Sequence, residues 1–329
     1  MWILIGDLHL TDQARDAYRF GIFDWIKQQQ AHNPVAATFL AGDITDAKDR
    51  HSATLVNKIV SGLTKLKPPV YICMGNHDYR DPGNPFFKFL NHIDGIKFVT
   101  KPKLISHGRH MAVIPHYRGQ DDFNAAIALV GHIADSFLVH QTFEGAIAES
   151  GVRLTGLSAS PIELLKPRLG VYAGDVHKPQ KQGIVTYVGC PYQIRFGDSF
   201  EPRVLFINEE GKKRNLYFPA PRKWSLTIRD SANIINNKDL CEGDQVKLTI
   251  EMAREEAIDW KKTRAEVLAV CREMKLDVYG VKLEIRTTKR RERIKVTKNN
   301  KEDIFDTFCK EENIATSIKE VGRKILLSE

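Results

Sequence analysis

The sequence lacks the cysteine pattern of a disulfide framework or a thiolate zinc site. Its five cysteines are scattered, odd in number and free of any Cys-x-x-Cys spacing. Long hydrophobic runs are also missing, because Trp2–Ile5 is cut off by Gly6 and Asp7 and is too short for a membrane span or a signal-peptide core. Internal repeats and low-complexity tracts are absent as well. We therefore expect a protein of a reducing cytoplasm with no membrane partner.

An excess of negative charge is missing too, since the 329 residues carry a formal net charge of +8. Hydrophobic residues make up 42% and charged residues 27% of the chain, which excludes the disordered and membrane classes. The positive charge favours a polyanionic partner such as nucleic acid, although it also fits simple solubility. The length predicts one large domain and a smaller one.

The first half of the chain alternates short apolar runs with helical stretches. Helices are predicted over 14–30 and 52–65, the second because Leu55, Ile59 and Leu63 recur at helical spacing. Each apolar run ends in a loop that holds Asp, His or Asn. The fold class is therefore α/β, with strands predicted at 3–5, 38–40, 70–73, 137–139 and 170–173.

Further along, the pattern becomes β-rich from Gly183, and Pro219-Ala220-Pro221 then forms a stiff connector. A small β-α-β module follows, with a strand at 245–251, a helix at 257–274 and a strand at 278–285. The predicted organisation is 1–219 as a catalytic domain, 222–288 as a smaller carboxyl-terminal domain, and 289–329 as a basic segment with final helices.

Five predicted strand ends carry side chains of the metal-ligand type. Any one of them alone is an ordinary loop residue or helix cap, but their recurrence at the same end of successive strands predicts a shared site. Asp46 is expected to brace its loop. The segments are Asp7-Leu8-His9, Gly42-Asp43-Ile44-Thr45-Asp46, Gly75-Asn76-His77-Asp78, His140, and Gly174-Asp175-Val176-His177.

The chemistry of these side chains indicates which ions they hold. Carboxylate, amide and imidazole ligands without thiolate suit Mn²⁺, Mg²⁺, Fe or Zn²⁺. Seven of these side chains acting as ligands would be too many for one ion. Two divalent cations that share a bridging carboxylate are therefore predicted, about 3.5–4 Å apart. Hydrolysis of a phosphate ester is the reaction that such a pair performs best.

These ordered motifs resemble the calcineurin-like metallophosphoesterase superfamily. The continuation from His177 through Lys178-Pro179-Gln180, with Tyr187–Tyr192 and Arg195-Phe196, resembles its SbcD-type DNA repair nucleases and their phage relatives. The resemblance implies two mixed β-sheets flanked by helices, a four-layer α/β/β/α sandwich, with a β-α-β capping domain. It also implies the cytoplasm of a bacterial or phage-infected cell as the setting, or alternatively the nucleoid.

The resemblance implies a role for each matching residue. One metal would take Asp7, His9 and His177, the other Asn76, His140 and Asp175, with Asp43 as the bridge. His77 would be the catalytic histidine and Asp78 would orient its ring, while the alternative for His77 is a brace behind the ligands.

Two residues depart from the family pattern. Asp175 stands where the first histidine of Gly-His-x-His is usual, which hardens the site toward Mn²⁺ or Mg²⁺ unless Asp175 turns away from the ion. Cys190 replaces a common serine and is expected to affect loop packing alone.

The resemblance also implies partners: DNA, a second copy of the chain, and an SMC-like ATPase of the SbcC type. Ile304, Phe305, Phe308 and the apolar face of the last helix would dock on that ATPase or pack on this chain instead. Residues expected to contact DNA, with a solvated charged surface as the alternative, are Lys178, Arg195, Lys289, Arg290, Arg291 and Arg293.

The function predicted from these observations and from the resemblance is a manganese-dependent DNA exonuclease, with endonuclease action left open, in an SbcCD-like repair and recombination complex. One alternative is a phosphomonoesterase or cyclic nucleotide phosphodiesterase on the same scaffold. Another is a DNA-binding scaffold whose metal site has decayed, for which Asp175 would be the first sign.

Overall fold

The computed structural model describes residues 1–286, 305–306, 308–310, 314 and 316–326. The chain divides into two compact units, the first formed by Met1–Ile250 with Lys262–Lys282 and the second by Glu251–Lys261 with Leu283–Glu329. The predicted boundary near 219–222 stays a prediction.

The first sheet is built around the amino-terminal strand. Its strand order is β12-β11-β1-β2-β3-β4, in which β1 to β4 run parallel and β11 and β12 run antiparallel to their neighbours. The parallel strands therefore end at one edge. The bounds are β1 Trp2–Ile5, β2 Ala37–Leu40, β3 Val70–Cys73, β4 Ile96–Val99, β11 Val204–Ile207 and β12 Lys213–Leu216.

The second sheet repeats this plan. Its order is β5-β6-β7-β8-β10-β9, with β6, β7, β8 and β10 parallel and the two edge strands antiparallel. Sequence patterns had predicted β7 and β8 but neither β5 nor β6. The bounds are β5 Lys103–Ser106, β6 His110–Ile114, β7 Ser136–His140, β8 Gly170–Gly174, β9 Gln180–Gln182 and β10 Val185–Tyr187.

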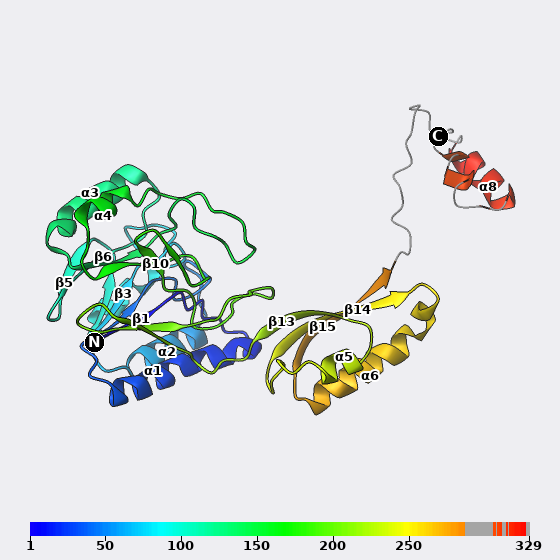
Figure 1. Ribbon diagram of the computed structural model, residues 1–329, viewed down its shortest axis with the longest axis horizontal. Helices are drawn as coiled ribbons and strands as arrows, with labels where there is room; N and C mark the ends of the chain where they lie inside the picture. The colour runs from blue at the N-terminus through cyan, green and yellow to red at the C-terminus, as the bar shows by residue number, and fades with distance from the viewer. Residues whose placement is uncertain (287–304, 307, 311–313, 315, 327–329) are drawn as a thin grey trace. The chain divides into compact units, whose positions relative to one another are not determined.

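Apolar side chains point alternately to the two faces of the central strands, and this arrangement produces four layers (Figure 1). Trp2 and Leu4 of β1 pack with Leu138 of β7 in the core between the two sheets, whereas Ile3 and Ile5 face the core under α1 and α2. Phe137 and Val139 of β7 face a third core, under α3 and α4. The predicted sandwich of two mixed sheets between helical layers is thus confirmed.

The helices begin and end where local chemistry requires. Ser52 accepts a hydrogen bond from the Leu55 amide and so caps α2, while the predicted first helix divides into a 3-10 turn, η1, and α1. Bounds in this part of the chain are η1 Ala14–Phe20, α1 Gly21–His32, α2 Ala53–Leu63, η2 Phe86–His92, α3 Gln120–Val130, η3 Gly131–Ile133 and α4 Ser160–Leu165.

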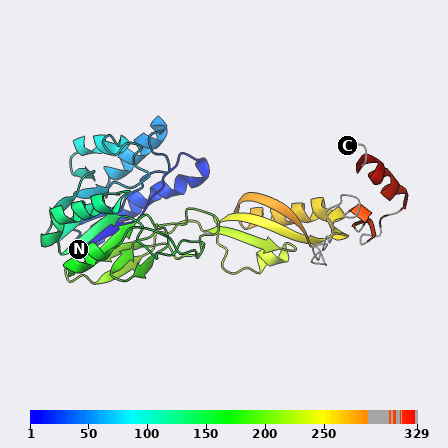
Figure 2. The same ribbon diagram turned by 90° about the horizontal axis from the view of Figure 1, so that it is seen from above.

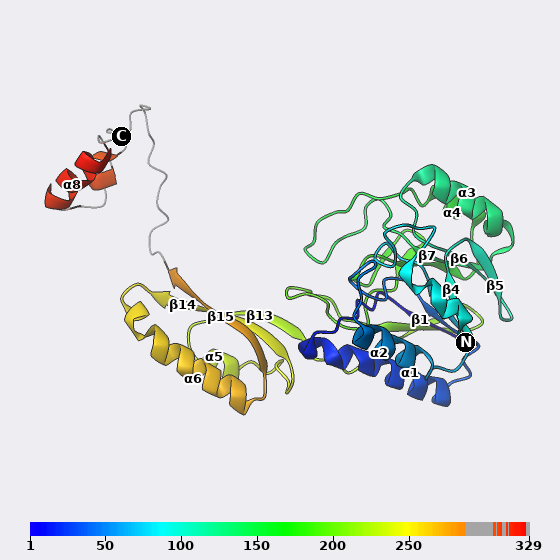
Figure 3. The ribbon, with the colours of Figure 1, turned by 180° about the vertical axis from the view of Figure 1, so that it is seen from behind.

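The carboxyl-terminal module contains a third sheet with the order β13-β14-β15. Its strands lie side by side in every view, and α5 and α6 lie on one face (Figures 1, 2 and 3). The structure adds β13 and α5 to the predicted β-α-β pattern. The bounds are β13 Lys223–Ile228, α5 Ala232–Ile235, β14 Gln245–Ala253, η4 Glu256–Asp259, α6 Trp260–Glu273, β15 Asp277–Arg286 and, further on, α8 Thr316–Leu326.

Within the described residues, no helix combines the length and the apolar character needed to traverse a membrane.

Leu138→Ala should test the core between the sheets. The Leu138 side chain is fully buried, so we expect a loss of about 2–5 kcal/mol in the free energy of unfolding from lost burial and the cavity left behind. Urea unfolding of the metal-free protein measures it. Leu129→Ala is the matched control, since Leu129 is 76% exposed and should change stability little. An equal loss in both variants would contradict this account of the core.

Candidate metal centre

The side chains predicted as metal ligands meet at the carboxyl ends of strands from both sheets. Asp7 and His9 follow β1, Asp43 follows β2, and Asn76 follows β3 in the first sheet. From the second sheet come His140, the last residue of β7, and Asp175 and His177 after β8. Asp7, His9, Asp43 and His140 are buried, and the other three are partly buried. The structure brings all seven predicted ligands to one place.

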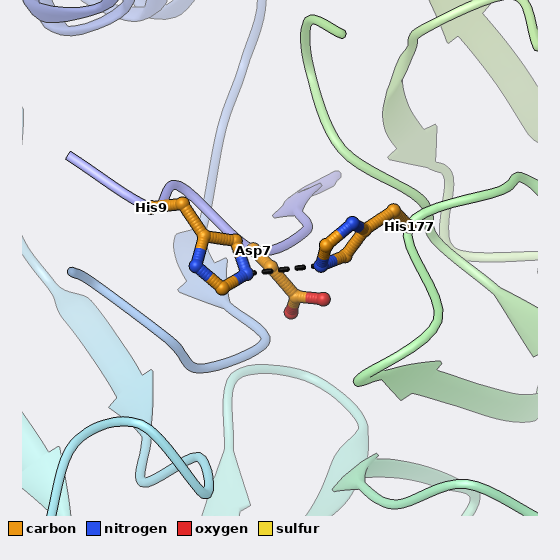
Figure 4. Close-up of side chains that lie close together, drawn as sticks. All are labelled: Asp7, His9 and His177. Carbon is orange, nitrogen blue, oxygen red and sulfur yellow. Dashed lines mark hydrogen bonds between the residues drawn. The ribbon is translucent and has the colours of Figure 1, made fainter. Parts of the chain in front are cut away.

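The first group consists of Asp7, His9 and His177 (Figure 4). One ligand atom of each lies within 4.8 Å of the others, and the Nε2 atoms of His9 and His177 face each other at 3.0 Å. Imidazole nitrogens that face each other so closely suit two ligands of a single ion, because only one of them can hold the shared proton.

The second group consists of Asp43, His140 and Asp175, again within 4.8 Å. His140 Nε2 lies 3.4 Å from Asp43 Oδ2 and 3.7 Å from Asp175 Oδ1, and Asn76 Nδ2 donates to Asp175 Oδ1 at 3.2 Å. Asp175 therefore points into the group and does not turn away from it. Asp43 Oδ2 also lies 3.9 Å from His9 Nε2, so Asp43 stands between the two groups.

Several ligand atoms are buried without a hydrogen-bond partner among the described residues: Asp7 Oδ1, Asn76 Oδ1 and His140 Nε2. Buried polar atoms normally find partners, so three such atoms in one cluster fit a site that takes a cation. His140 Nδ1 meets the Ala41 carbonyl oxygen at 2.6 Å, which fixes its proton on Nδ1 and leaves Nε2 free as a ligand.

Glycines in the motifs let these loops pack against the ligands. A Cβ at Gly75 would lie 2.2 Å from Asp43 Oδ1, and a Cβ at Gly42 would lie 2.3 Å from His140 Nδ1. His9, Asp43 and Asp175 themselves have positive φ angles of 43°, 49° and 78°. Such backbone is unfavourable for residues other than glycine and persists where surrounding contacts impose it, typically at functional sites.

The pKa values reflect the crowding of charge. Burial raises the pKa of Asp7 to about 7; the positive charge of His140 opposes this rise and the Asp43 carboxylate adds to it. Burial alone would lower the pKa of His140, but Asp43, Asp7 and Asp175 raise it well above its usual value. Burial and the charge of His9 lower the pKa of His177 to about 4. The cluster thus retains protons that a cation would replace.

The predicted pairing of His77 with Asp78 is corrected by the structure. Asp78 is buried, and its carboxylate accepts from the amides of Asp43, Ile44 and Gly75 at 2.9, 2.9 and 2.8 Å. The His77 ring instead meets the Asp46 carbonyl oxygen through Nδ1 at 2.9 Å. Asp78 therefore braces the two ligand loops, because three amides take up its acceptor oxygens.

Asp46 has a larger role than the predicted loop brace. Its Oδ1 lies 2.6 Å from Nδ1 of His9, and this contact orients the imidazole so that Nε2 faces the site.

Two residues in the loop after β7 were missed by sequence reasoning. Thr142 Oγ1 donates to Asp175 Oδ2 at 2.5 Å, and the His177 amide donates to Glu149 Oε1 at 3.2 Å. Neither belongs to a motif; their proximity to His140 in sequence was the one available signal.

The residues predicted to contact DNA are placed only in part. Lys178 lines a cavity of about 280 Å³ together with Pro179, Phe200, Glu201, Arg203, Asn215 and Tyr217. The Arg195 side chain is exposed. Lys289, Arg290, Arg291 and Arg293 lie outside the described residues.

Comparison with known proteins identifies the scaffold on which this centre is built. Residues 3–153 match the family model of the calcineurin-like phosphoesterases. This segment is a calcineurin-like phosphoesterase domain. The chain is also similar to exonuclease subunit 1 of Enterobacteria phage T4, at 23% identity over 236 residues, which cover 68% of this chain and 69% of the relative. The predicted superfamily is confirmed for this segment, and the match supports a metal-dependent phosphoesterase.

Metal binding by this phosphoesterase should weaken as the pH falls. The metal-free Asp7 carboxyl has a pKa of about 7 and binds an ion only after losing its proton; His9 and His140, whose pKa values are also raised, act in the same direction. Below pH 7 we expect the Mn²⁺ affinity to fall by about tenfold per pH unit for each proton displaced. Calorimetry in buffers of different ionisation enthalpy measures the released protons. Equal affinity at pH 6 and pH 8 would contradict the expectation.

Proposed function

We propose that the protein is a DNA nuclease that depends on two divalent cations and acts as an exonuclease, with endonuclease action as an alternative. The observation that carries this proposal is the meeting of two ligand groups at Asp43, which suits a pair of ions on one phosphodiester. Its similarity to a phage protein named as an exonuclease subunit supports DNA as the substrate.

In this proposal Asp7, His9 and His177 hold one ion, Asn76, His140 and Asp175 hold the other, and Asp43 bridges them. Three carboxylates and an amide oxygen favour Mn²⁺, with Mg²⁺ as the alternative. When bound, the ions polarise the phosphoryl oxygens and supply hydroxide at neutral pH. Thr142 and Asn76 keep Asp175 aimed at the site through their hydrogen bonds, which argues against a decayed centre.

His77 is the proposed acid. Because a carbonyl oxygen only accepts, the contact with Asp46 places a proton on Nδ1 and leaves Nε2 for the substrate. In the imidazolium form Nε2 also carries a proton, which it gives to the leaving oxygen. Asp78 acts indirectly, by holding the loops of Asp43 and Asn76 together.

The carboxyl-terminal residues are proposed to serve macromolecular partners. Residues 222–288 would act as a capping domain over DNA, with Lys178 and Arg195 as phosphate contacts nearer the metals. Ile318 and Val321 of α8 are 64% and 58% exposed, and Phe308 is 38% exposed. Apolar residues exposed at helical spacing support docking on an SMC-type ATPase of the SbcC kind. A homodimer in the cytoplasm or nucleoid completes the proposal.

The function is tested with end-labelled single- and double-stranded DNA incubated with Mn²⁺ or Mg²⁺. We expect Mn²⁺ to support degradation, Asp7→Ala to abolish it, and His77→Ala to lower kcat by about a hundredfold or more through loss of the proton donor. His132→Ala, at an exposed histidine of η3, is the matched control and should retain activity. Hydrolysis of nitrophenyl phosphate without any action on DNA would favour a phosphomonoesterase instead.

Asp175→His should shift the metal preference. The substitution replaces a hard oxygen ligand with an imidazole, so we expect the affinity for Zn²⁺ to rise relative to that for Mn²⁺. Competition titrations with both ions on the purified protein measure the ratio. Thr142→Val, which removes the hydroxyl that holds Asp175, should weaken binding of both ions without this shift. An unchanged ratio in Asp175→His would mean that Asp175 does not contact an ion.

A further inference from the structure

One end of the third sheet contacts the turn η1, and each of the three strands contributes a contact. Lys223, the first residue of β13, places Nζ 3.3 Å from Asp16 Oδ1. Gln245, the first residue of β14, donates through Nε2 to the Arg15 carbonyl at 2.8 Å. Asp277, the first residue of β15, lies 3.5 Å from Arg15 Nε. η1 is therefore the point at which the sheet joins the phosphoesterase domain.

The Lys223 ammonium is held in a dry aromatic setting. Lys223 is 6% exposed, and Nζ lies 5.4 Å from the ring centroid of Phe196 and 5.5 Å from that of Tyr279. Its own amide donates to Gln193 Oε1 at 2.6 Å. A buried charge of this kind needs its partner, so Lys223 and Asp16 constrain each other's position strongly.

The Asp16 carboxylate also pairs with Arg19, and Arg19 in turn contacts the main chain at the metal centre. Arg19 Nη2 lies 3.1 Å from Asp16 Oδ1, and Arg19 is 2% exposed. Its Nη1 donates to the carbonyl oxygen of His9 at 2.6 Å, and Nη2 donates to that of Ile194 at 3.4 Å. A continuous set of buried charged contacts thus runs from the start of β13 to the main chain of a predicted metal ligand.

We propose that Lys223, Asp16 and Arg19 are positioning residues that fix His9 for metal binding and make its geometry depend on the docked sheet. The proposal rests on the metal centre assigned above. His9 has a φ of 43°, which surrounding contacts must impose, and the forked guanidinium supplies one of them. Without Lys223, Arg19 is the one remaining ion-pair partner of Asp16 among the described residues, and we expect the guanidinium to shift with the carboxylate away from His9.

The alternative is that this network only stabilises the attachment of the sheet. The two readings differ in what happens at the metal site, so the test uses two readouts on the full chain. Calorimetry with Mn²⁺ gives the affinity, and hydrogen–deuterium exchange in chelator follows the amides of Leu8 and His9, which donate to the Asp43 carbonyl at 3.1 and 3.0 Å. Exchange reports on the metal-free loop.

Lys223→Met removes the charge while keeping a long apolar side chain. We expect Mn²⁺ binding at one of two sites to weaken by about tenfold or more, as for other residues that orient a ligand, and exchange at residues 8–9 to accelerate. Lys223→Arg, which keeps the ion pair with Asp16, should restore both. The control Lys65→Met removes an exposed ion pair with Asp24 and should change neither.

Unchanged Mn²⁺ affinity and exchange in Lys223→Met would overturn the proposal, even if thermal stability falls. The same changes in Lys65→Met would overturn it as well. Should Lys223→Met fail to fold, Arg19→Lys carries the test, because lysine keeps the charge beside Asp16 but lacks the fork that reaches two carbonyls. If the unmodified chain bound no Mn²⁺, the proposed metal centre would fail, and positioning of His9 would be judged on exchange alone.

Discussion

The site depends on several carboxylates being kept dry and close together. Asp7, Asp43 and Asp78 are all buried. Burial raises the pKa of Asp7 to about 7 and that of Asp78 to about 6, and repulsion from the Asp43 carboxylate adds to both shifts. Backbone amides offset part of this cost, since Asp7 Oδ2 accepts from the Asp175 amide at 3.0 Å and Asp43 Oδ1 from the His77 amide at 2.8 Å. The same bonds that stabilise the charges therefore tie the loops together.

These bonds also connect the two sheets. Asp7 follows β1 of the first sheet and Asp175 follows β8 of the second, and His140 of β7 donates to the carbonyl of Ala41, which follows β2. The ligands of each proposed ion come from both sheets, so the packing between the sheets sets the distances within the site. This makes the buried layer around Leu138 part of the functional architecture as well as of the core.

Sequence patterns were sufficient to predict which side chains meet in one place, because a local rule governs their position. Parallel strands end at the same edge, so polar residues after successive apolar runs converge wherever the runs are parallel. The α/β class followed from the same pattern, whereas the four layers were implied by the family resemblance. Strands β5, β6 and β13 were not predicted, because their alternation of apolar and polar residues is short or interrupted by exposed charges such as Lys103. η1 was predicted as part of a longer helix, because the spacing of apolar residues does not distinguish a 3-10 turn from an α-helix.

The orientation of the ligands could not be predicted, because it depends on partners distant in sequence. Asp78 adjoins His77 in the chain, yet its oxygens accept from amides of another loop. Thr142 contacts Asp175 and Glu149 contacts His177, both from a segment without a motif. Arg19 acts on His9 through a carbonyl that every residue possesses. Motif residues thus fix which atoms can bind, while residues outside the motifs decide how those atoms are aimed. A departure such as Asp175 is therefore to be judged from the hydrogen bonds that hold it and not from the letter in the motif.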